Sequence, residues 1–369
     1  MDSQGNGIPR NMEERPAMRF IGHTGRTGRI GFVALAAVVL VGACSSGSSP
    51  TPAASAAPVA SAAPAASAAP TASAAASTPA KTFTVGSMIW NTSVGFYANF
   101  IKGQQEEAAA LGITLDLQSG NGDLATEVSV IQQFITKKVD MIIVTPSDAE
   151  GIVPAIKQAN DAGIPVISAN NQVGQGASIV TFVGADDYQF GQKQGELLVK
   201  AVGENAKVGY VMGKLGTSAQ TLRKKGLDDY LKTHTGIKLI ESQAADWDNA
   251  KALALVQDWL SKYPAGSIDA IIDQGPEGAT AAKYAFDNGR KDVKFMMGDY
   301  PKDVKDGITA GYIYGTVDQD PHPQGVESVK MANFWLLGQK DKVPQPTYYL
   351  DLPIVTSENV SQYPAAWGG

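Results

Sequence analysis

Short apolar runs alternate with amphipathic stretches along this chain from Phe83 onward, and this rhythm limits the folds that are open to it. The run Met141–Val144 is apolar at every position, as in strands that are buried on both faces of a parallel sheet. Strands that are separated by helices form parallel sheets, because each return to the sheet needs a long crossover. The pattern predicts an α/β fold with doubly wound parallel sheets.

The periodicity predicts individual elements as well. The sequence Ser147-Asp148-Ala149-Glu150 matches a capping box, which predicts a helix that opens there and ends at Gly163. A globular part of this length is expected to divide into two similar lobes. The strands are expected at 83–89, 113–117, 141–144, 164–167, 179–183, 207–212, 238–241, 268–273 and 293–297, and the other helices at 96–111, 124–138, after 217, 248–262 and 277–288.

The N-terminal segment 1–43 is typical of a signal peptide. Arginines at 19, 26 and 29 precede the uncharged apolar run Ile30–Ala43, which is shorter than the roughly 20 residues that cross a bilayer as a helix. The run ends in Val41-Gly42-Ala43-Cys44, which resembles the bacterial lipobox, in which the cysteine is lipidated. We expect Cys44 to anchor the protein at the outer face of the cytoplasmic membrane.

The following stretch, 44–81, is predicted to be a disordered tether. It consists almost entirely of Ser, Ala, Pro and Thr, and Val59 is its one larger aliphatic side chain. Such a composition buries too little apolar surface to offset the entropy of ordering. We therefore expect a globular part held near the membrane but free of it.

Composition excludes several classes of function. The net charge is −6 and no basic cluster stands out, which argues against nucleic acid as a partner. One cysteine and three histidines (His23, His234 and His322) exclude a Cys-rich zinc site and an internal disulfide framework. We expect no metal, no cofactor and no catalytic residues.

Polar side chains gather where the predicted strands end. Ligands of open parallel sheets bind beyond the carboxyl ends of the strands. The residues there combine amides, hydroxyls and carboxylates with two tryptophans, Trp90 and Trp247. Amides both donate and accept hydrogen bonds, and aromatic faces cover the apolar face of a sugar ring. The set predicts a site for a small molecule with many hydroxyl groups.

Over residues 82–365 the chain resembles the ribose/galactose-type periplasmic (type I) sugar-binding proteins of ABC importers. The segments that carry the resemblance are GFYANFIKGQQEEAAALGI (95–113), IIVTPSDAEGIVPAIKQANDAGIPVI (142–167), VGADDYQFGQKQGELL (183–198), GTSAQTLRKKG (216–226), ADWDNAKAL (245–253), IIDQGPEGATAAKYA (271–285) and GTVDQDPHPQGVESV (315–329). The resemblance implies two Rossmann-like lobes joined by a hinge, which close on a ligand. They would comprise 82–184 with 320–347, and 185–319 with 348–369. It implies a monomer that works with a permease and an ATPase.

The resemblance also implies roles for particular residues. The cleft aromatics of the family fall on Phe96, Tyr97 and Trp247, its sugar-binding arginine on Arg223, its second-lobe aspartate on Asp299 and its hinge glutamine on Gln319. An Arg and an Asp that face a cleft can hold neighbouring hydroxyls by charge-assisted hydrogen bonds. We expect their replacement to weaken binding and to lower stability little.

The structural alternatives for these positions are a solvated helix residue for Arg223, a core residue for Trp247 and a cap of the turn at Pro301 for Asp299. The chain departs from the family at three places, one of which is a pair of residues. Asn170-Asn171 stands where the family often has Asp-Arg, and Thr145 and Gly275 each replace an asparagine. These changes favour a pyranose, a polyol or another small polar molecule over ribose.

Three other functions compete with this interpretation. The segment Gly120–Ala125 matches G-x-G-x-x-A, as in dinucleotide-binding enzymes, but it follows the second strand instead of the first. A transcription regulator of the same fold would need a DNA-binding N-terminus in place of the signal peptide. A receptor that signals to a membrane sensor stays open, because its ligand chemistry would be the same.

Overall fold

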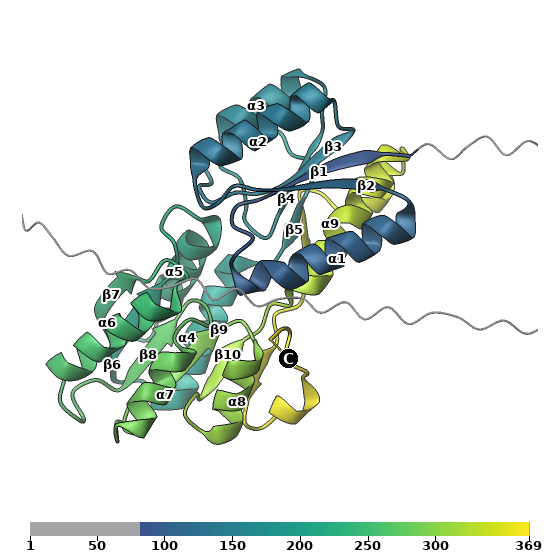
Figure 1. Ribbon diagram of the computed structural model, residues 1–369. Helices are drawn as coiled ribbons and strands as arrows, with labels where there is room; N and C mark the ends of the chain where they lie inside the picture. The colour runs from purple at the N-terminus through teal and green to yellow at the C-terminus, as the bar shows by residue number, and fades with distance from the viewer. Residues whose placement is uncertain (1–81, 369) are drawn as a thin grey trace, which may run out of the picture. The chain divides into compact units, whose positions relative to one another are not determined.

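The computed structural model describes residues 82–368, so the predicted signal peptide, Cys44 and the tether lie outside the described residues. The first of its two six-stranded sheets has the order β11-β5-β4-β3-β1-β2, and every neighbouring pair is parallel (Figure 1). Its strands are β1 (Thr84–Ile89), β2 (Thr114–Ser119), β3 (Met141–Thr145), β4 (Val166–Ala169), β5 (Phe182–Gly184) and β11 (Thr347–Tyr349).

The second sheet repeats this order as β12-β10-β9-β8-β6-β7, with only β12 antiparallel to its neighbour. Two lobes with parallel sheets confirm the predicted α/β fold. The strands are β6 (Ala206–Met212), β7 (Ile237–Ala244), β8 (Ala270–Asp273), β9 (Lys294–Gly298), β10 (Gly315–Val317) and β12 (Ile354–Thr356).

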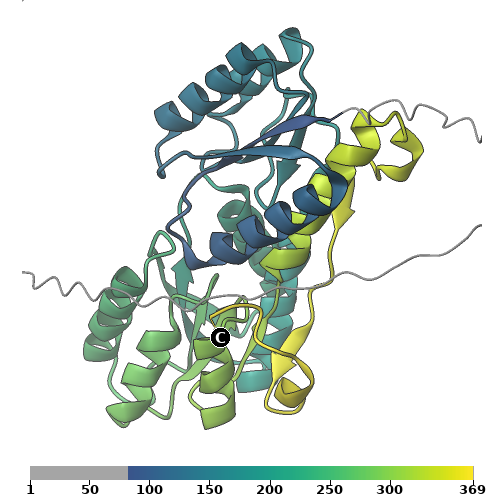
Figure 2. The same cartoon turned by 45° about the vertical axis from the view of Figure 1, so that its right-hand side comes forward.

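Helices cover both faces of each sheet, so each sheet separates two apolar clusters. In the first lobe, α1 (Gly95–Leu111) and α9 (Pro321–Leu336) lie side by side on one face, as Figure 2 shows. The opposite face carries α2 (Leu124–Lys137) and α3 (Val153–Asp161). In the second lobe, α4 (Asp187–Val202) and α5 (Ser218–Leu231) cover one face, and α6 (Asn249–Lys262), α7 (Ala279–Asp287) and α8 (Lys302–Ala310) cover the other.

One predicted helix start is wrong. The capping-box pattern placed it at Ser147, but α3 begins at Val153. The Asp148 Oδ1 accepts from the backbone N–H groups of Glu150 and Gly151, at 3.1 and 2.9 Å, and so forms a local turn. Aspartate side chains make this bond in turns as readily as at helix caps, which is why the sequence pattern misled.

The chain passes between the two lobes three times. It crosses after β5, where α4 begins, at 318–320 between β10 and α9, and at 350–353 between β11 and β12. The expected boundaries at 184/185, 319/320 and 347/348 remain predictions, and β11 extends the first sheet to Tyr349. Three adjacent crossings form a natural hinge.

Glycines let the paired helices approach closely. A Cβ atom on Gly191 of α4 would lie 2.0 Å from the Arg223 carbonyl oxygen of α5, and one on Gly226 would lie 2.0 Å from the Tyr188 carbonyl oxygen. Gly103 has the same function between α1 and α9. This contact brings the Arg223 backbone against α4 and so fixes where its side chain begins.

We predict that Gly191→Ala lowers the free energy of unfolding by about 1–3 kcal/mol, because two helix backbones must separate to admit the methyl group. Gly95→Ala is the matched control, since its nearest neighbour would be Trp367 Nε1 at 3.8 Å. Thermal and urea unfolding measure both variants. Equal stability of Gly191→Ala and the parent would contradict the close packing.

Candidate functional site

A cavity of about 900 Å³ lies between the lobes, at the carboxyl ends of the strands of both sheets. That volume suits a small ligand. Nine of the eleven residues that the sequence predicted for ligand binding line it: Trp90, Phe96, Tyr97, Asn170, Asn171, Arg223, Trp247, Asp299 and Gln319. Their contact with a ligand stays a prediction.

The other two predicted residues, Thr145 and Gly275, are not among those that line the cavity. The fully buried Thr145 accepts from the Trp90 backbone N–H at 3.1 Å. The Gly275 N–H donates to the Asp273 Oδ1 at 3.1 Å, and its carbonyl accepts from Gly298. Both residues therefore hold the loops that carry the cavity wall.

Left-handed backbone turns present several of these side chains. Asn170, Asp246, Trp247 and Asp299 have φ angles of 58°, 57°, 62° and 60°. Asn and Asp adopt this conformation more easily than other residues, whereas a bulky Trp there is strained. Such strain concentrates at functional sites. The Trp247 indole lies directly over Gly213 and lines the cavity, where it is half-buried and packs against the apolar cluster of the first lobe.

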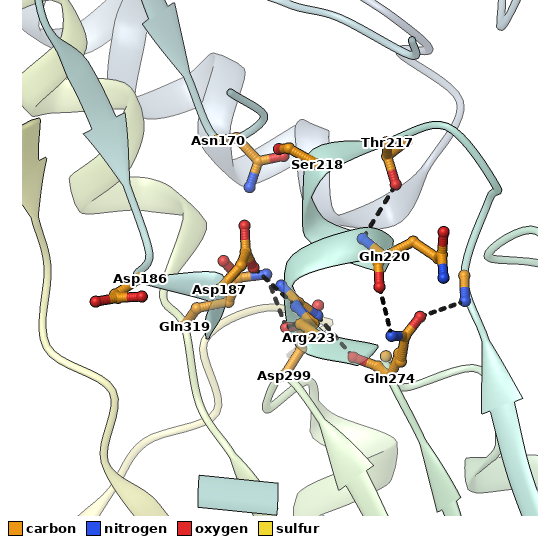
Figure 3. Close-up of polar contacts among 12 residues, drawn as sticks. Asn170, Asp186, Asp187, Thr217, Ser218, Gln220, Arg223, Gln274, Asp299 and Gln319 are labelled. Carbon is orange, nitrogen blue, oxygen red and sulfur yellow. Dashed lines mark hydrogen bonds and ion pairs between the residues drawn. The ribbon is translucent and has the colours of Figure 1, made fainter. Parts of the chain in front are cut away.

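Arg223 organises the second-lobe wall (Figure 3). Its side chain is only 2% exposed, so it is not a solvated helix residue. The Nε donates to the Asp187 Oδ1 at 2.8 Å, and the Nη1 donates to the Gln274 carbonyl at 2.6 Å. The guanidinium also lies 3.8 Å from the centre of the Phe190 ring. Arg223 is therefore held in place from three sides.

Asp299 is the second buried charge of this wall. Its Oδ1 lies 3.8 Å from the Arg223 Nη1 and accepts from the Gln319 Nε2 at 2.9 Å. Burial raises the pKa of Asp299 to about 6, although Arg223 and the Gln319 amide favour its ionised form. Asp299 does not cap α8, because α8 begins after Pro301 without a side-chain cap.

The buried ion pairs of Arg223 argue against the expectation that its replacement lowers stability little. Its removal would leave the buried carboxylates of Asp187 and Asp299 without their cation. Breaking a buried ion pair by removing one partner costs about 3–5 kcal/mol. Arg223 therefore stabilises the fold as well as shaping the cavity.

Sequence reasoning missed Asp187 and Trp367. Two consecutive acids at a helix start indicate caps, and Asp186 does cap α4, whereas Asp187 turns inward to Arg223. No local signal identifies Trp367, because only the returning C-terminal segment brings it to the cavity. Its carbonyl accepts from the Lys302 N–H at 2.9 Å, and its ring packs edge-on against Phe96 at 5.5 Å.

This segment connects the two lobes. The Ala366 N–H donates to the Tyr300 carbonyl of the second lobe at 2.9 Å. The Ala366 carbonyl accepts from the Asn99 Nδ2 of α1, in the first lobe, at 3.0 Å. Trp367 thus joins Trp90 and Trp247 as a third indole on the cavity wall.

The glycine-rich segment 120–125 does not leave room for a pyrophosphate. A Cβ on Gly120 would lie 2.4 Å from the Glu127 Cγ. The Glu127 carboxylate is buried at the start of α2 and accepts from the Ser147 N–H at 3.2 Å. The Glu127 side chain already occupies this helix terminus, which argues against a dinucleotide there.

Within residues 82–368, no group of three or more His, Cys, Asp and Glu side chains could hold a metal ion. No helix in the same range is long and apolar enough to span a membrane.

Comparison with known proteins places the chain in a family. Residues 85–340 match the model of the periplasmic binding protein domain. The ribose import binding protein RbsB of Escherichia coli (strain K12) is 29% identical over 276 residues, which cover 74% of this chain and 91% of that protein. The chain therefore belongs to the periplasmic binding protein family, whose members are solute-binding proteins outside the cytoplasm. The predicted resemblance is confirmed.

Two solved structures are similar over the same part of the chain. An ABC transporter solute binding protein from Bacillus halodurans C-125 with bound myo-inositol has a TM-score of 0.71 and 27% identity, covering 76% of this chain and 96% of that one. A periplasmic solute binding protein from Actinobacillus succinogenes 130z with bound D-allose has a TM-score of 0.68 and 26% identity, covering 76% and 99%.

A buried carboxyl group in the second crossing makes stability depend on pH. Asp318 is 8% exposed, and its Oδ1 has no hydrogen-bond partner among the described residues. Burial raises the pKa of Asp318 to about 8, and the charges of Asp299 and Asp320 act in the same direction. The folded state then binds a proton more tightly than the unfolded state, so this group lowers stability as pH rises from about 4 to about 8.

We predict that Asp318→Asn raises the free energy of unfolding at pH 9 and flattens its decline between pH 4 and 8. Each pKa unit corresponds to about 1.4 kcal/mol, so the gain at pH 9 is on the order of a few kcal/mol. At pH 4 parent and variant are expected to be nearly equal. Urea unfolding across this range measures the effect, and a variant less stable than the parent at pH 9 would contradict it.

Proposed function

We propose that this protein captures a small sugar or polyol in its interlobe cavity and delivers it to the permease and ATPase of an ABC importer. The observation that carries the proposal is the cavity wall. Three indoles surround it, and buried amides and charges face the same space from both lobes. This combination suits a molecule that has many hydroxyl groups and an apolar ring face.

The polar groups of the wall favour binding over catalysis. Arg223 and Asp299 are bonded to Asp187, Gln274 and Gln319, so they are fixed before any ligand arrives. Preorganised groups bind tightly because little entropy is lost on association. We infer a non-enzymatic protein in which these groups hold hydroxyls.

The similar proteins support the ligand class. The structures from Bacillus halodurans and Actinobacillus succinogenes hold myo-inositol and D-allose, a cyclic polyol and a pyranose-forming sugar. Asn170 and Asn171 give the first-lobe wall a neutral pair, as the sequence indicated. A neutral pair suits an uncharged ligand, since no buried charge there needs a partner.

The anchoring is part of the same proposal. The apolar run and Val41-Gly42-Ala43-Cys44 support lipidation of Cys44, and the Ala/Ser/Pro-rich stretch supports a tether. We infer a monomer that is held at the outer face of the cytoplasmic membrane. Diacylglycerol on Cys44 would hold it more firmly than a single acyl chain.

We predict that the purified protein binds at least one of D-ribose, D-allose, myo-inositol, xylitol and glycerol. At a hundredfold excess over Kd, the bound compound should raise the free energy of unfolding by about 2.7 kcal/mol. Calorimetry and thermal shift measure binding. Asp299→Asn should weaken it at least tenfold, since a hydrogen bond to a charged group contributes roughly 1.5–3 kcal/mol.

Asp258→Asn is the matched control, because Asp258 is exposed on α6 and does not line the cavity. It should bind as the parent does. Absence of binding for all five compounds would argue against the proposed ligand class. Parent-like binding by Asp299→Asn would remove Asp299 from the site.

We also predict that Cys44→Ala releases the protein from the membrane, because the sulfur that carries the lipid is lost. Fractionation and carbonate washing of cells expressing either form measure this, with Ser45→Ala as the control. A Cys44→Ala protein that stays in the membrane fraction would show that another feature provides the anchor.

A further inference from the structure

A chain of hydrogen bonds begins among the first-lobe residues of the cavity wall. The Trp90 Nε1–H donates to the Tyr97 hydroxyl at 2.7 Å, and the Tyr97 hydroxyl donates to the Asn170 Oδ1 at 2.7 Å. The Asn170 Nδ2 then donates to the Gln324 Oε1 at 3.2 Å. Gln324 lies on α9, is fully buried and is not among the residues that line the cavity.

The chain continues through the second crossing into the other lobe. The Gln324 Nε2 donates to the Gln319 Oε1 at 3.2 Å, and the Gln319 Nε2 donates to the Asp299 Oδ1 at 2.9 Å. Asp299 in turn lies beside Arg223. One continuous series of side chains therefore joins the ends of β1 and β9, and Gln324 lies in its middle.

The two ends of this series fix its direction. An indole N–H can only donate a hydrogen bond, and an ionised carboxylate can only accept one. Asp299 therefore requires the nitrogen of Gln319, whose oxygen requires the nitrogen of Gln324. The Gln324 oxygen then requires the nitrogen of Asn170. The oxygen of Asn170 is left for the Tyr97 hydroxyl, whose own oxygen accepts from Trp90. Each amide thus has one permitted orientation.

We propose that Gln324 is a positioning residue, which holds in place the donors that Asn170 and Gln319 present to a ligand in the cavity. The part of this inference that concerns a ligand rests on the proposed function. The hydrogen-bond chain itself does not depend on that function. With both amides oriented this way, one N–H of Asn170 and one of Gln319 remain for the cavity. Without Gln324, the Asn170 oxygen still accepts from Tyr97 and the Gln319 nitrogen still donates to Asp299, but each amide loses its second bond in the chain and is held less rigidly.

The first lobe offers a matched control. Gln104 on α1 is also fully buried and also makes two side-chain hydrogen bonds, from Ser87 Oγ at 2.8 Å and to Ser328 Oγ at 3.1 Å. It does not line the cavity, and its partners lie outside the chain from Trp90 to Asp299. Gln104→Met and Gln324→Met therefore remove equivalent interactions and keep a similar side-chain volume.

The first experiment uses the unliganded protein. The side-chain amide resonances of Asn170 and Gln319 are recorded by NMR and assigned by their loss in Asn170→Asp and Gln319→Glu. Gln324→Met should shift both resonances and speed their exchange with solvent, whereas Gln104→Met should leave them in place. Unchanged Asn170 and Gln319 amides in a folded Gln324→Met protein would overturn the proposal.

The second experiment measures affinity for D-ribose, D-allose, myo-inositol, xylitol and glycerol in the parent and both variants. Gln324→Met should weaken the tightest of these by about tenfold and reduce the differences among them, since two neutral hydrogen bonds no longer orient the site. Gln104→Met should lower the melting temperature by a similar amount but bind like the parent. Equal losses of affinity in the two variants would show a purely structural effect.

The two experiments separate this proposal from the proposed function. If the parent binds none of the five compounds, the proposed ligand class fails, yet the amide resonances still test the positioning role. If the parent binds and Gln324→Met binds equally well, only the positioning role fails.

Discussion

The buried guanidinium of Arg223 is the interaction on which the second-lobe wall depends. It links Asp187 at the start of α4, the Gln274 carbonyl after β8 and Asp299 after β9. A cation without these partners would not stay buried, and the carboxylates would be equally costly without the cation. The same charges thus position the strand-end loops and place polar groups at the cavity, so stability and binding draw on one set of residues.

Parallel strand order decides where this wall faces. Both sheets share the order in which the first strand lies between the second and the third, so both bring their carboxyl ends to the cavity. Left-handed turns at Asn170, Trp247 and Asp299 then direct side chains into it. The strain of these turns is compensated by bonds to neighbours, as the contact between Asp299 and Gln319 illustrates.

The three crossings and the C-terminal segment connect the two lobes, each of which is built on its own sheet. Gln319 lies in the second crossing and contacts Asp299 of the second lobe and Gln324 of α9. Ala366 and Trp367 are anchored to the second lobe by backbone bonds and contact Asn99 and Phe96 of α1. Bending at the crossings would alter these contacts, which couples the hinge to the shape of the cavity.

The sequence by itself determined the fold class and nine of the residues that line the cavity. Periodicity is a local property, and parallel strands necessarily end on one edge, so Trp90, Asn170 and Asp299 could be placed there in advance. Only the tertiary structure decided how the charges pair and which residues stand behind the wall. Asp187, next to the residue that caps α4, turns inward to Arg223, and Trp367 reaches the cavity from the end of the chain. Those outcomes depend on contacts between residues far apart in sequence, and no local pattern records them.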